Sequence, residues 1–393
     1  MGPPGADPAG VPAKGRAVIL AVDCREFVPG RVTGIGRFLG GLLEEIARSR
    51  PDLETVALAE PMAPIPVAAP HIQVHRLPQR LPLYWDQVLL PRALREVGAT
   101  VFFSPYYKAP LAAPCPTVVT IHDLIPLRFP AYSRGRWRLH AAAFRIWAAL
   151  LARRAAAVIT DSEHSKLDLV SVLGLPPERV HAIPIGVGEE FRSGPAPEAV
   201  ASAVARYGIS GQYLLTIGNF LPHKNLPRLV EAHQGLPATL RRRFTLVLAG
   251  TAARHGPAQS VEPLSLARPG VLLPGFIAPE DLPLLYAGAT ALVCPSLAEG
   301  FGLPVLEAMA CGTPVVCARA GALPEVVGDA ALFVDPTDVE SIVAGLKRIL
   351  EDAALRLDLS ARGLARARLY DTRKTTACLV DLLEEIAAGR AER

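Results

Sequence analysis

Residues 289–314 read ATALVCPSLAEGFGLPVLEAMACGTP, and this stretch decides the fold. It begins with a short apolar run at 289–296, continues through a loop with two glycines, and ends in an apolar segment. Pro304 suits the first position of a helix, and Gly312 suits a helix C-cap. The stretch therefore predicts a strand, a loop and a helix in succession, which is the repeating unit of a parallel α/β sheet.

The same alternation continues on both sides of this stretch. Strand-like runs in the first half of the chain lie at 17–23, 54–60, 72–78, 99–105, 116–123, 156–163 and 180–187. Further runs in the second half lie at 212–219, 244–250, 270–276, 313–318 and 331–336. Amphipathic patterns such as 37–50 fill the intervals. We therefore predict an α/β protein with two Rossmann-like, doubly wound domains that face each other across a cleft.

Composition marks the expected domain boundaries. Residues 1–16 are rich in Gly, Pro and Ala and have no apolar core, so we predict a disordered tail rather than a signal peptide. A Gly/Pro-rich and then polar stretch predicts an interdomain linker at 191–211 that leads into a short helix, between an N-terminal domain at 17–190 and a C-terminal domain at 212–370. The amphipathic segment 371–393 predicts a last helix, which we expect to return to the N-terminal domain.

Bulk composition restricts the classes of function. The 393-residue chain carries a formal net charge of +4, which is too small to argue for nucleic acid. Its six cysteines and nine histidines form no pattern typical of a zinc site, and no apolar run is long enough to span a bilayer. We therefore expect a cytoplasmic protein with reduced thiols, no metal and no nucleic-acid partner.

The loop in the opening stretch is suited to an anion. Gly300 and Gly302 let the backbone approach a ligand closely, and the N-terminus of the following helix favours phosphate. Two carboxylates, Glu299 and Glu307, flank this loop. Beside a phosphate they are suited to accept hydrogen bonds from sugar hydroxyls, Glu299 from a hexose and Glu307 from a ribose. The alternatives are a surface charge at Glu299 and a first-turn glutamate that complements the helix dipole at Glu307.

This constellation resembles a known enzyme family. Glu299 and Glu307, separated by seven residues around Gly-Phe-Gly-Leu-Pro, resemble the signature of the family 4 retaining glycosyltransferases, whose two-domain fold is called GT-B. TGIGRF, HDLIP and PHKN resemble the mannosyl- and rhamnosyltransferase branch. Other matching stretches lie at 33–38, 120–126, 159–169, 216–233, 273–289 and 321–338.

The resemblance implies a donor site made mostly by the C-terminal domain. It places Glu299 on the hydroxyls of the donor sugar, Glu307 on the ribose and Lys224 on the diphosphate, where a cation stabilises the leaving group. The other implied donor contacts are the loop residues Gly300, Phe301, Gly302 and Leu303, the nucleobase neighbours Phe276 and Ile277, Gly218 of the donor loop, and Gly34, Gly36 and Arg37 of the N-terminal domain.

One position in the donor loop sets this chain apart. Many family members carry Arg directly after the glycine that matches Gly218, whereas this chain carries Asn219. The implied cationic clamp therefore lacks one charge. We expect His223, beside Lys224, to replace part of that charge, with a solvent-facing histidine as the alternative.

A second group of predicted site residues lies in the first half of the chain. His122 and Asp123 end a predicted strand at the edge facing the cleft, so His122 is expected to contact the donor sugar or to orient the acceptor. A histidine satisfied by a hydrogen bond at the strand end is the alternative. Ser162 and Glu163 end the next strand and are expected, with Asp123, to border the acceptor. The predicted catalytic residues are Glu299, Lys224 and His122.

The resemblance implies a reaction that retains the anomeric configuration. The chain has no Asp-x-Asp pair to chelate a cation on a diphosphate, so we expect catalysis without metal or cofactor. The expected substrates are a nucleotide sugar, GDP-mannose in preference, and a saccharide or lipid-linked acceptor in surface polysaccharide biosynthesis. The basic amphipathic segment 133–158 is compatible with peripheral contact to anionic lipid or with a helix packed on the first domain.

Other functions remain to be weighed against this one. A sugar-nucleotide 2-epimerase of the same fold and a non-catalytic nucleotide-sugar-binding protein are the alternatives. A dinucleotide-binding enzyme is disfavoured, because roughly ten residues separate the strand at 17–23 from Gly34, whereas that fingerprint needs the turn directly after the strand.

Overall fold

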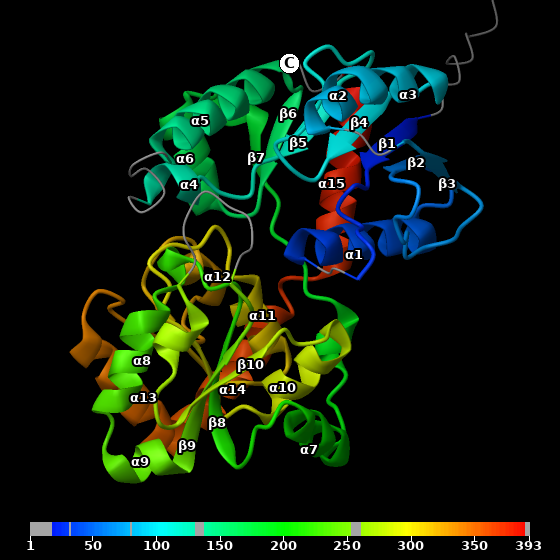
Figure 1. Ribbon diagram of the computed structural model, residues 1–393. Coiled ribbons are helices and arrows are strands. Elements are labelled where there is room, and N and C mark those ends of the chain that lie inside the picture. Colours follow the sequence, from blue (N-terminus) through cyan, green and yellow to red (C-terminus); the bar gives the residue numbers. More distant parts are fainter. Residues whose placement is uncertain (1–17, 31–32, 79–80, 130–136, 253–260, 390–393) are drawn as a thin grey trace, which may run out of the picture.

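The computed structural model describes residues 18–30, 33–78, 81–129, 137–252 and 261–389 (Figure 1). The predicted disordered tail at 1–16 lies outside the described residues. Two α/β domains make up the molecule, and the C-terminal helix, red in Figure 1, lies within the first of them. The predicted class, an α/β protein with two doubly wound parallel sheets, is confirmed.

The N-terminal domain contains a seven-stranded parallel sheet with the order β3-β2-β1-β4-β5-β6-β7. Its strands are β1 (Ile19–Asp23), β2 (Glu54–Ala59), β3 (Ile72–Arg76), β4 (Val101–Ser104), β5 (Thr117–Thr120), β6 (Ala157–Thr160) and β7 (Val180–Ala182). The helical elements are α1 (Gly34–Ser49), α2 (Pro82–Tyr84), η1 (Trp85–Leu89), α3 (Leu90–Glu96), α4 (Ile125–Arg128), α5 (Trp137–Arg154), α6 (Glu163–Leu173) and η3 (Pro177–Arg179).

Both faces of this sheet are buried, which explains why its strands read as continuous apolar runs. Successive side chains of a strand point to opposite faces. Leu20 and Val22 of β1 pack with α1 and with α15 (Thr372–Ala387), whereas Ala21 packs with α3, α5 and α6. The sheet therefore has helices on each side, and its carboxyl edge stays free to meet the second domain.

The C-terminal domain contains a six-stranded parallel sheet with the order β10-β9-β8-β11-β12-β13. Its strands are β8 (Gln212–Ile217), β9 (Phe244–Ala249), β10 (Val271–Gly275), β11 (Ala291–Cys294), β12 (Val315–Ala318) and β13 (Leu332–Val334). The helical elements are η5 (Pro222–Lys224), α8 (Leu226–Gly235), α9 (Ala238–Arg243), η6 (Pro263–Leu266), η7 (Pro279–Asp281), α10 (Leu282–Gly288), α11 (Leu303–Ala310), α12 (Leu323–Val327), α13 (Val339–Glu351) and α14 (Ala353–Ala367).

The stretch predicted as a linker contains the short helix that the sequence indicates. Residues 191–211 contain the end of η4 (Glu189–Arg192) and all of α7 (Pro197–Arg206). Ala203 of α7 is fully buried in the core of the C-terminal domain, and α7 packs on α10. Phe191 of η4 is buried in the same core, so the Gly/Pro-rich residues after η4 connect two elements that both pack on the second domain.

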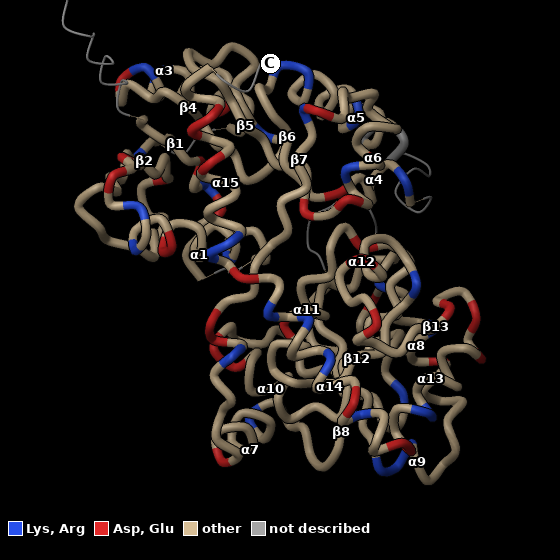
Figure 2. The backbone as a smooth tube through the Cα atoms, turned by 180° about the vertical axis from the view of Figure 1, so that it is seen from behind, with Lys and Arg blue, Asp and Glu red and all other residues tan. Residues whose placement is uncertain are grey.

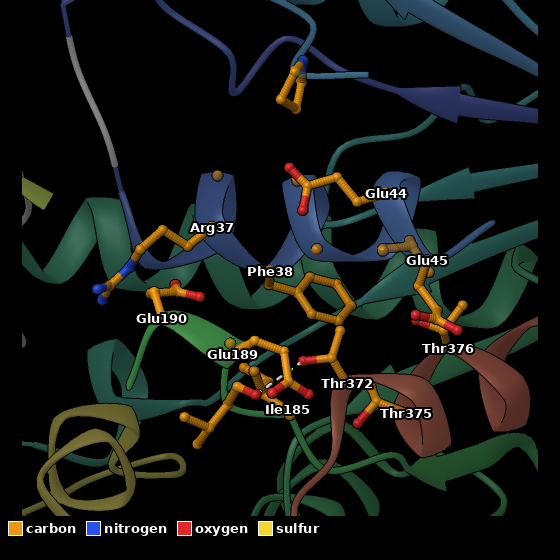
Figure 3. A pocket seen from close by; sticks show the side chains of 18 of the residues that line it. Arg37, Phe38, Glu44, Glu45, Ile185, Glu189, Glu190, Thr372, Thr375 and Thr376 are labelled. Atoms are coloured by element: carbon orange, nitrogen blue, oxygen red, sulfur yellow. Dashed lines mark hydrogen bonds between the residues drawn. The ribbon is translucent and has the colours of Figure 1, made fainter. Parts of the chain in front are cut away.

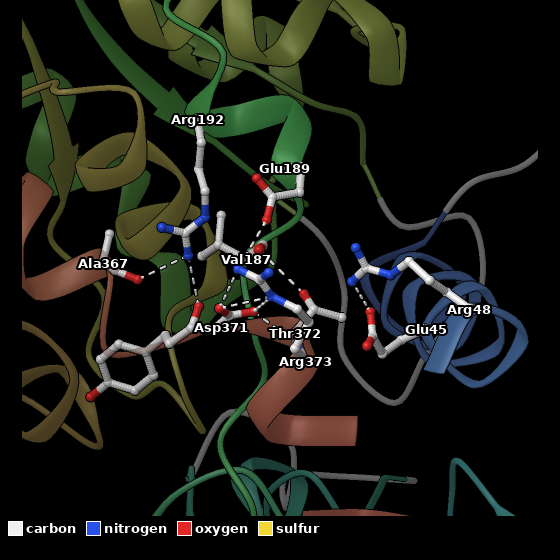
Figure 4. Close-up of polar contacts among 10 residues, drawn as sticks. Glu45, Arg48, Val187, Glu189, Arg192, Ala367, Asp371, Thr372 and Arg373 are labelled. Carbon is white, nitrogen blue, oxygen red and sulfur yellow. Dashed lines mark hydrogen bonds and ion pairs between the residues drawn. The ribbon is translucent and has the colours of Figure 1, made fainter. Parts of the chain in front are cut away.

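The chain crosses between the domains twice, and the two crossings are paired (Figure 4). The Val187 N–H donates to the carbonyl of Tyr370 at 3.1 Å, and the Thr372 hydroxyl donates to the carbonyl of Val187 at 3.2 Å. From there α15 runs back over the N-terminal domain, where it packs on α1 and β4. The hinge is thus a hydrogen-bonded double connection.

Gly186 allows the two crossings to approach. A Cβ atom at this position would lie 2.3 Å from the backbone nitrogen and 2.4 Å from the Cα of Thr372. We expect Gly186→Ala to lower the free energy of unfolding by about 1–3 kcal/mol, the usual cost of overpacking. Gly40→Ala on α1 is the control, because its Cβ would meet only ordinary contacts at 3.7 Å or beyond. Urea unfolding of both variants checks this, and equal stabilities would contradict it.

Candidate active site

The carboxyl edges of the two sheets meet at one loop of the C-terminal domain. The hydroxyls of Ser162 and Ser165, which follow β6, donate to the carbonyl of Gly300, after β11, at 2.7 and 3.1 Å. A Cβ atom on Gly300 would lie 2.7 Å from the Cβ of Asp123, which follows β5. The domains therefore touch at the position predicted to hold the donor sugar, and only glycine fits there.

A second contact across the cleft involves the N-terminus of α6. Ser162 caps this helix by accepting a hydrogen bond from the Ser165 N–H at 3.1 Å. The backbone N–H groups of Glu163 and His164 donate to the two carboxylate oxygens of Glu325 on α12, at 2.9 and 3.0 Å. The structure thus gives Ser162 and Glu163 roles in the domain contact. Their predicted role at the acceptor stays a prediction.

Lys224 and Glu299 form a buried ion pair at 2.7 Å. Glu299 Oε1 also accepts a hydrogen bond from the Ser296 hydroxyl at 2.6 Å. Burial alone lowers the pKa of Lys224, but the neighbouring Glu299 raises it above its ordinary value. For Glu299 burial acts to raise the pKa, yet Lys224 and Ser296 hold it below its ordinary range. Both groups are therefore charged at neutral pH, as their predicted roles require.

Tight backbone geometry positions this pair. Gly218 has φ +147°, and a Cβ there would lie 3.7 Å from the Cε of Lys224. Asn225, directly after Lys224, adopts a left-handed conformation and donates to the carbonyls of Pro295 and Pro336 at 3.0 and 2.7 Å. Gly321, with φ +57°, lies so close to Glu299 that a Cβ would sit 2.4 Å from the Glu299 carbonyl. The ion pair thus lies in a rigid frame.

Glu307 is buried and forms an ion pair with the other domain. Its Oε1 lies 2.9 Å from Nη2 of Arg37 on α1, and its Oε2 accepts a hydrogen bond from the Tyr286 hydroxyl at 2.8 Å. Burial raises the pKa of Glu307 to about 7, although Arg37 and Tyr286 act to lower it. Glu307 lies in the second turn of α11, not the first, so the helix-dipole alternative is weakened.

His122 makes hydrogen bonds through both ring nitrogens. Nδ1 lies 2.8 Å from Oδ2 of Asp161, and Nε2 lies 3.1 Å from the carbonyl of Pro105. Burial alone lowers the pKa of His122, but the Asp161 carboxylate raises it to about 9. The ring is therefore an imidazolium that donates to two protein oxygens. This geometry matches the strand-end alternative, and the predicted contact of His122 with a substrate stays a prediction.

His223 does not supply the charge that Asn219 lacks. Its side chain is buried and lies beside the Phe129 ring of the N-terminal domain, with the ring centroids 6.3 Å apart. Burial, together with the charge of Lys224, lowers the pKa of His223 to about 4. The expected cationic role of His223 is therefore wrong at neutral pH, and its aromatic contact joins the two domains instead.

The remaining predicted donor residues differ in exposure. Ile277 and Phe301 are buried, and Phe301 packs edge-on against Tyr370 at 5.8 Å. Phe276 is 57% exposed, so it is free to contact a ligand. Gly34 begins α1, and Gly302, at φ +102°, precedes α11 directly. Asn219 lies near Lys224 and Glu299 around a cavity of about 20 Å³, together with Gly218.

A larger cavity of about 760 Å³ lies beside the hinge (Figure 3). It is lined by α1, by the crossing residues 185–191 and by the start of α15. Gly36, Arg37, Leu303 and Glu307 also line it, so it reaches the N-terminus of α11. In Figure 2 backbone positions of acidic and of basic residues lie near each other where α1 approaches the hinge. Eight of the predicted donor residues thus line one or the other of two cavities, which both reach the start of α11, one at Leu303 and the other at Pro304.

Sequence reasoning missed the partners that hold the predicted residues. Ser296 donates to Glu299, Tyr286 donates to Glu307, and Asp161 pairs with His122. Asp161 lies near the carboxyl end of the predicted strand at 156–163 and Ser296 ends that at 289–296, which was the available signal. In the described part of the chain no group of three or more His, Cys, Asp or Glu side chains is arranged to hold a metal ion, and all six cysteines are free.

Comparison with known proteins places these residues in context. Residues 32–191 match the model for Glycosyltransferase Family 4, and residues 209–366 match that for Glycosyl transferases group 1. O-antigen chain mannosyltransferase B of Escherichia coli is 33% identical over 371 residues, which cover 88% of this chain and 94% of that protein. Serotype-specific mannosyltransferase WbdA of E. coli is 31% identical over 292 residues. The match covers 71% of this chain but only 35% of that protein.

Solved structures share the whole fold at lower identity. Sucrose-phosphate synthase from Thermosynechococcus elongatus superposes with a TM-score of 0.75 at 21% identity, covering 95% of this chain and all of that one. WaaG, a glycosyltransferase involved in lipopolysaccharide biosynthesis, superposes with a TM-score of 0.71 at 19% identity, covering 93% of this chain and 99% of that one. Both chains are covered almost completely, so the likeness includes the arrangement of two domains.

The His122–Asp161 pair predicts a pH-dependent stability. Because the pKa of folded His122 lies above its ordinary 6.5, the pair stabilises the fold fully below about pH 6.5 and loses this effect as the pH rises through about 9. We expect the stability difference between wild type and Asp161→Asn to be largest near pH 6 and to shrink towards pH 10. Urea unfolding across this range measures it, with the exposed Asp329→Asn as control. A difference independent of pH would contradict the assignment.

Proposed function

Because this chain belongs to the family 4 glycosyltransferases, we propose that it transfers a hexose, mannose in preference, from a nucleotide sugar to a saccharide or lipid-linked acceptor. The family resemblance inferred from Glu299, Glu307 and their surroundings is confirmed by both family models. The chain is a GT-B glycosyltransferase of the mannosyltransferase-like branch, and its relatives act in O-antigen synthesis, which is polysaccharide biosynthesis. The base, the sugar, the stereochemistry and the metal independence belong to the proposal.

The observation that carries the proposal is the Lys224–Glu299 pair beside the N-terminus of α11. The Glu299 carboxylate receives its hydrogen bonds from Lys224, Cys294 and Ser296 at Oε1, so Oε2 is available to accept from sugar hydroxyls. The backbone N–H groups at the start of α11 favour a phosphate. Sugar and diphosphate thus have adjacent partners of the required chemistry.

In the proposed reaction the bond between the anomeric carbon and the diphosphate oxygen breaks, and its electron pair goes to the diphosphate. The acceptor hydroxyl forms the new bond on the same face and gives its proton to a diphosphate oxygen, so configuration is retained. Lys224 stabilises the negative charge that grows on the leaving group. No second carboxylate is assigned as a nucleophile, because Glu299 is occupied in binding.

The acceptor is expected at the carboxyl edge of the first sheet. Asp123 lies at this edge beside Gly300, and its Oδ1 already accepts a hydrogen bond from the Ile125 N–H at 2.9 Å. Burial raises the pKa of Asp123 above its ordinary value. A half-buried carboxyl group at the meeting point of the domains is suited to orient a saccharide hydroxyl.

Peripheral membrane contact is the second part of the proposal. No described helix is long and apolar enough to cross a bilayer. On α5, Leu139, Ile146 and Leu150 are exposed, with Arg145, Arg153 and Arg154 exposed near them. Exposed apolar and basic side chains on one helix suit an anionic lipid surface, where a lipid-linked acceptor would lie. We propose a cytoplasmic enzyme that binds the membrane this way, and sedimentation with anionic vesicles tests it.

A donor panel tests the proposed function. Thermal unfolding is measured with GDP-, UDP-, dTDP- and ADP-sugars in the presence of EDTA. A ligand that binds only the folded state raises its stability by about 2.7 kcal/mol at 100 times its Kd. We expect GDP-mannose to give the largest shift and EDTA to leave it unchanged. If no nucleotide sugar shifts the melting temperature, the proposed function fails. Donor turnover without acceptor to a C2-epimer would support the epimerase instead.

Removal of the Lys224 charge tests the catalytic assignment. We expect Lys224→Ala to lower kcat by about 10²–10³-fold, the usual effect of losing one group that stabilises transition-state charge. Release of nucleoside diphosphate with saccharide acceptors measures it, and the anomeric signal of the product by NMR reports retention. Lys347→Ala, exposed on α13, is the control. An unchanged kcat in Lys224→Ala would remove Lys224 from the mechanism.

A further inference from the structure

Arg37 reaches from α1 in the N-terminal domain into the second domain. Its Nη2 lies 2.9 Å from Glu307 Oε1, and its guanidinium carbon lies 5.9 Å from the centre of the Phe191 ring. Its Nη1 is buried and has no hydrogen-bond partner among the described residues. Figure 3 shows the side chain extending from α1 past Glu190. One arm of the guanidinium is therefore bonded, and the other is left without a partner.

The bonded arm of Arg37 contacts the Glu307 oxygen that a bound nucleotide sugar would use. Glu307 Oε2 already accepts a hydrogen bond from Tyr286, so Oε1 is the oxygen left for a ribose hydroxyl. Arg37 holds that oxygen in the present structure. A carboxylate oxygen can accept two hydrogen bonds, but a ribose hydroxyl that approaches Oε1 from the cavity would enter where the guanidinium now lies, so ribose and Arg37 compete for the space beside Oε1. A bound ribose would release the guanidinium into the cavity that Arg37, Leu303 and Glu307 line together.

A diphosphate would be the natural next partner of the released group. Leu303 begins α11, so the helix N-terminus where phosphate is favoured opens on the same cavity as Arg37. Lys224 approaches from the other side of the loop, next to Glu299. A guanidinium binds phosphate oxygens through two parallel hydrogen bonds and is fully charged. Asn219 and the neutral His223 do not supply a second positive charge beside Lys224. Arg37 supplies such a charge within the site, from the opposite domain.

We propose that Arg37 is a ligand of the donor diphosphate, exchanged on donor binding from Glu307, whose oxygen passes to the ribose. This inference rests on the proposed function and adds a catalytic residue to it. Arg37 then neutralises the leaving group from the N-terminal domain while Lys224 does so from the C-terminal domain. Because the two residues belong to different domains, the full clamp exists only when the domains are closed on a donor.

Calorimetric binding of guanosine and of GDP separates this role from a purely structural one. The proteins compared are wild type, Arg37→Gln, Arg37→Lys and Arg48→Gln; Arg48 lies on the same helix, lines the same cavity and pairs with Glu45. We expect Arg37→Gln to bind guanosine at least as tightly as wild type, because Glu307 is freed. Its affinity for GDP should fall by about 10–100-fold, the usual effect of losing hydrogen bonds to a charged group. Arg37→Lys should lie between the two, and Arg48→Gln should match wild type.

Steady-state kinetics with GDP-mannose supply the second readout, and kcat should fall in Arg37→Gln by at least 10-fold. The inference is overturned if Arg37→Gln binds GDP as tightly as wild type, or if its affinities for GDP and guanosine rise by the same factor. Arg37 then acts only as a contact between domains. If wild-type protein binds neither GDP nor any other nucleoside diphosphate, the proposed function itself fails. Circular dichroism checks that each variant is folded. If Arg37→Gln does not fold, the same comparison of guanosine and GDP is made with Arg37→Lys.

Discussion

The arrangement of the two domains depends on the absence of a side chain at Gly300. Its carbonyl accepts two serine hydroxyls from the start of α6, and a single Cβ would collide with Asp123. The carboxyl ends of β5, β6 and β11 can therefore converge on one loop. Parallel α/β sheets place their ligand sites at such ends. Two sheets that share one glycine-containing loop combine two half-sites into one cleft, and any larger residue would separate them where transfer is proposed to occur.

The same closeness explains why the cleft contains paired charges. Lys224 pairs with Glu299, and Arg37 pairs with Glu307, in surroundings where a lone charge would be costly. Each pair joins a cation suited to phosphate with a carboxylate suited to sugar hydroxyls. A nucleotide sugar carries both complements in one molecule, so its binding would replace each intramolecular partner by a ligand group. The unliganded site thus stays neutralised without forming a permanent structural salt bridge.

Much of this could be predicted from the sequence, because the relevant signals are local. Strand-like runs alternate with amphipathic segments, and each strand end carries the next polar residue toward the same edge, which placed His122 at the cleft. The family resemblance, carried by an equally local motif, implied the roles of Glu299 and Lys224. At 191–211 the local signal was mixed, so the sequence indicated a linker leading into a short helix but not where that helix packs. The stretch 191–211 combines Gly/Pro with polar residues, and its second part forms α7 because Ala203 is buried against the C-terminal domain. The titration states of His122 and His223 depend on burial and on neighbours that composition does not reveal.

The contacts between domains were beyond sequence reasoning for a different physical reason. Arg37 and Glu307 sit on helices of separate sheets, and their distance depends on the angle at the hinge rather than on either helix. That angle is held by hydrogen bonds of the Val187 backbone with the Tyr370 carbonyl and the Thr372 hydroxyl, in a crossing where Thr372 leaves no room for a side chain at Gly186. A periodicity argument fixes which face of α1 Arg37 occupies, but not what that face meets. The sequence therefore predicts the helix on which each such residue lies. Its partner across the hinge can be identified only when the hinge geometry is known.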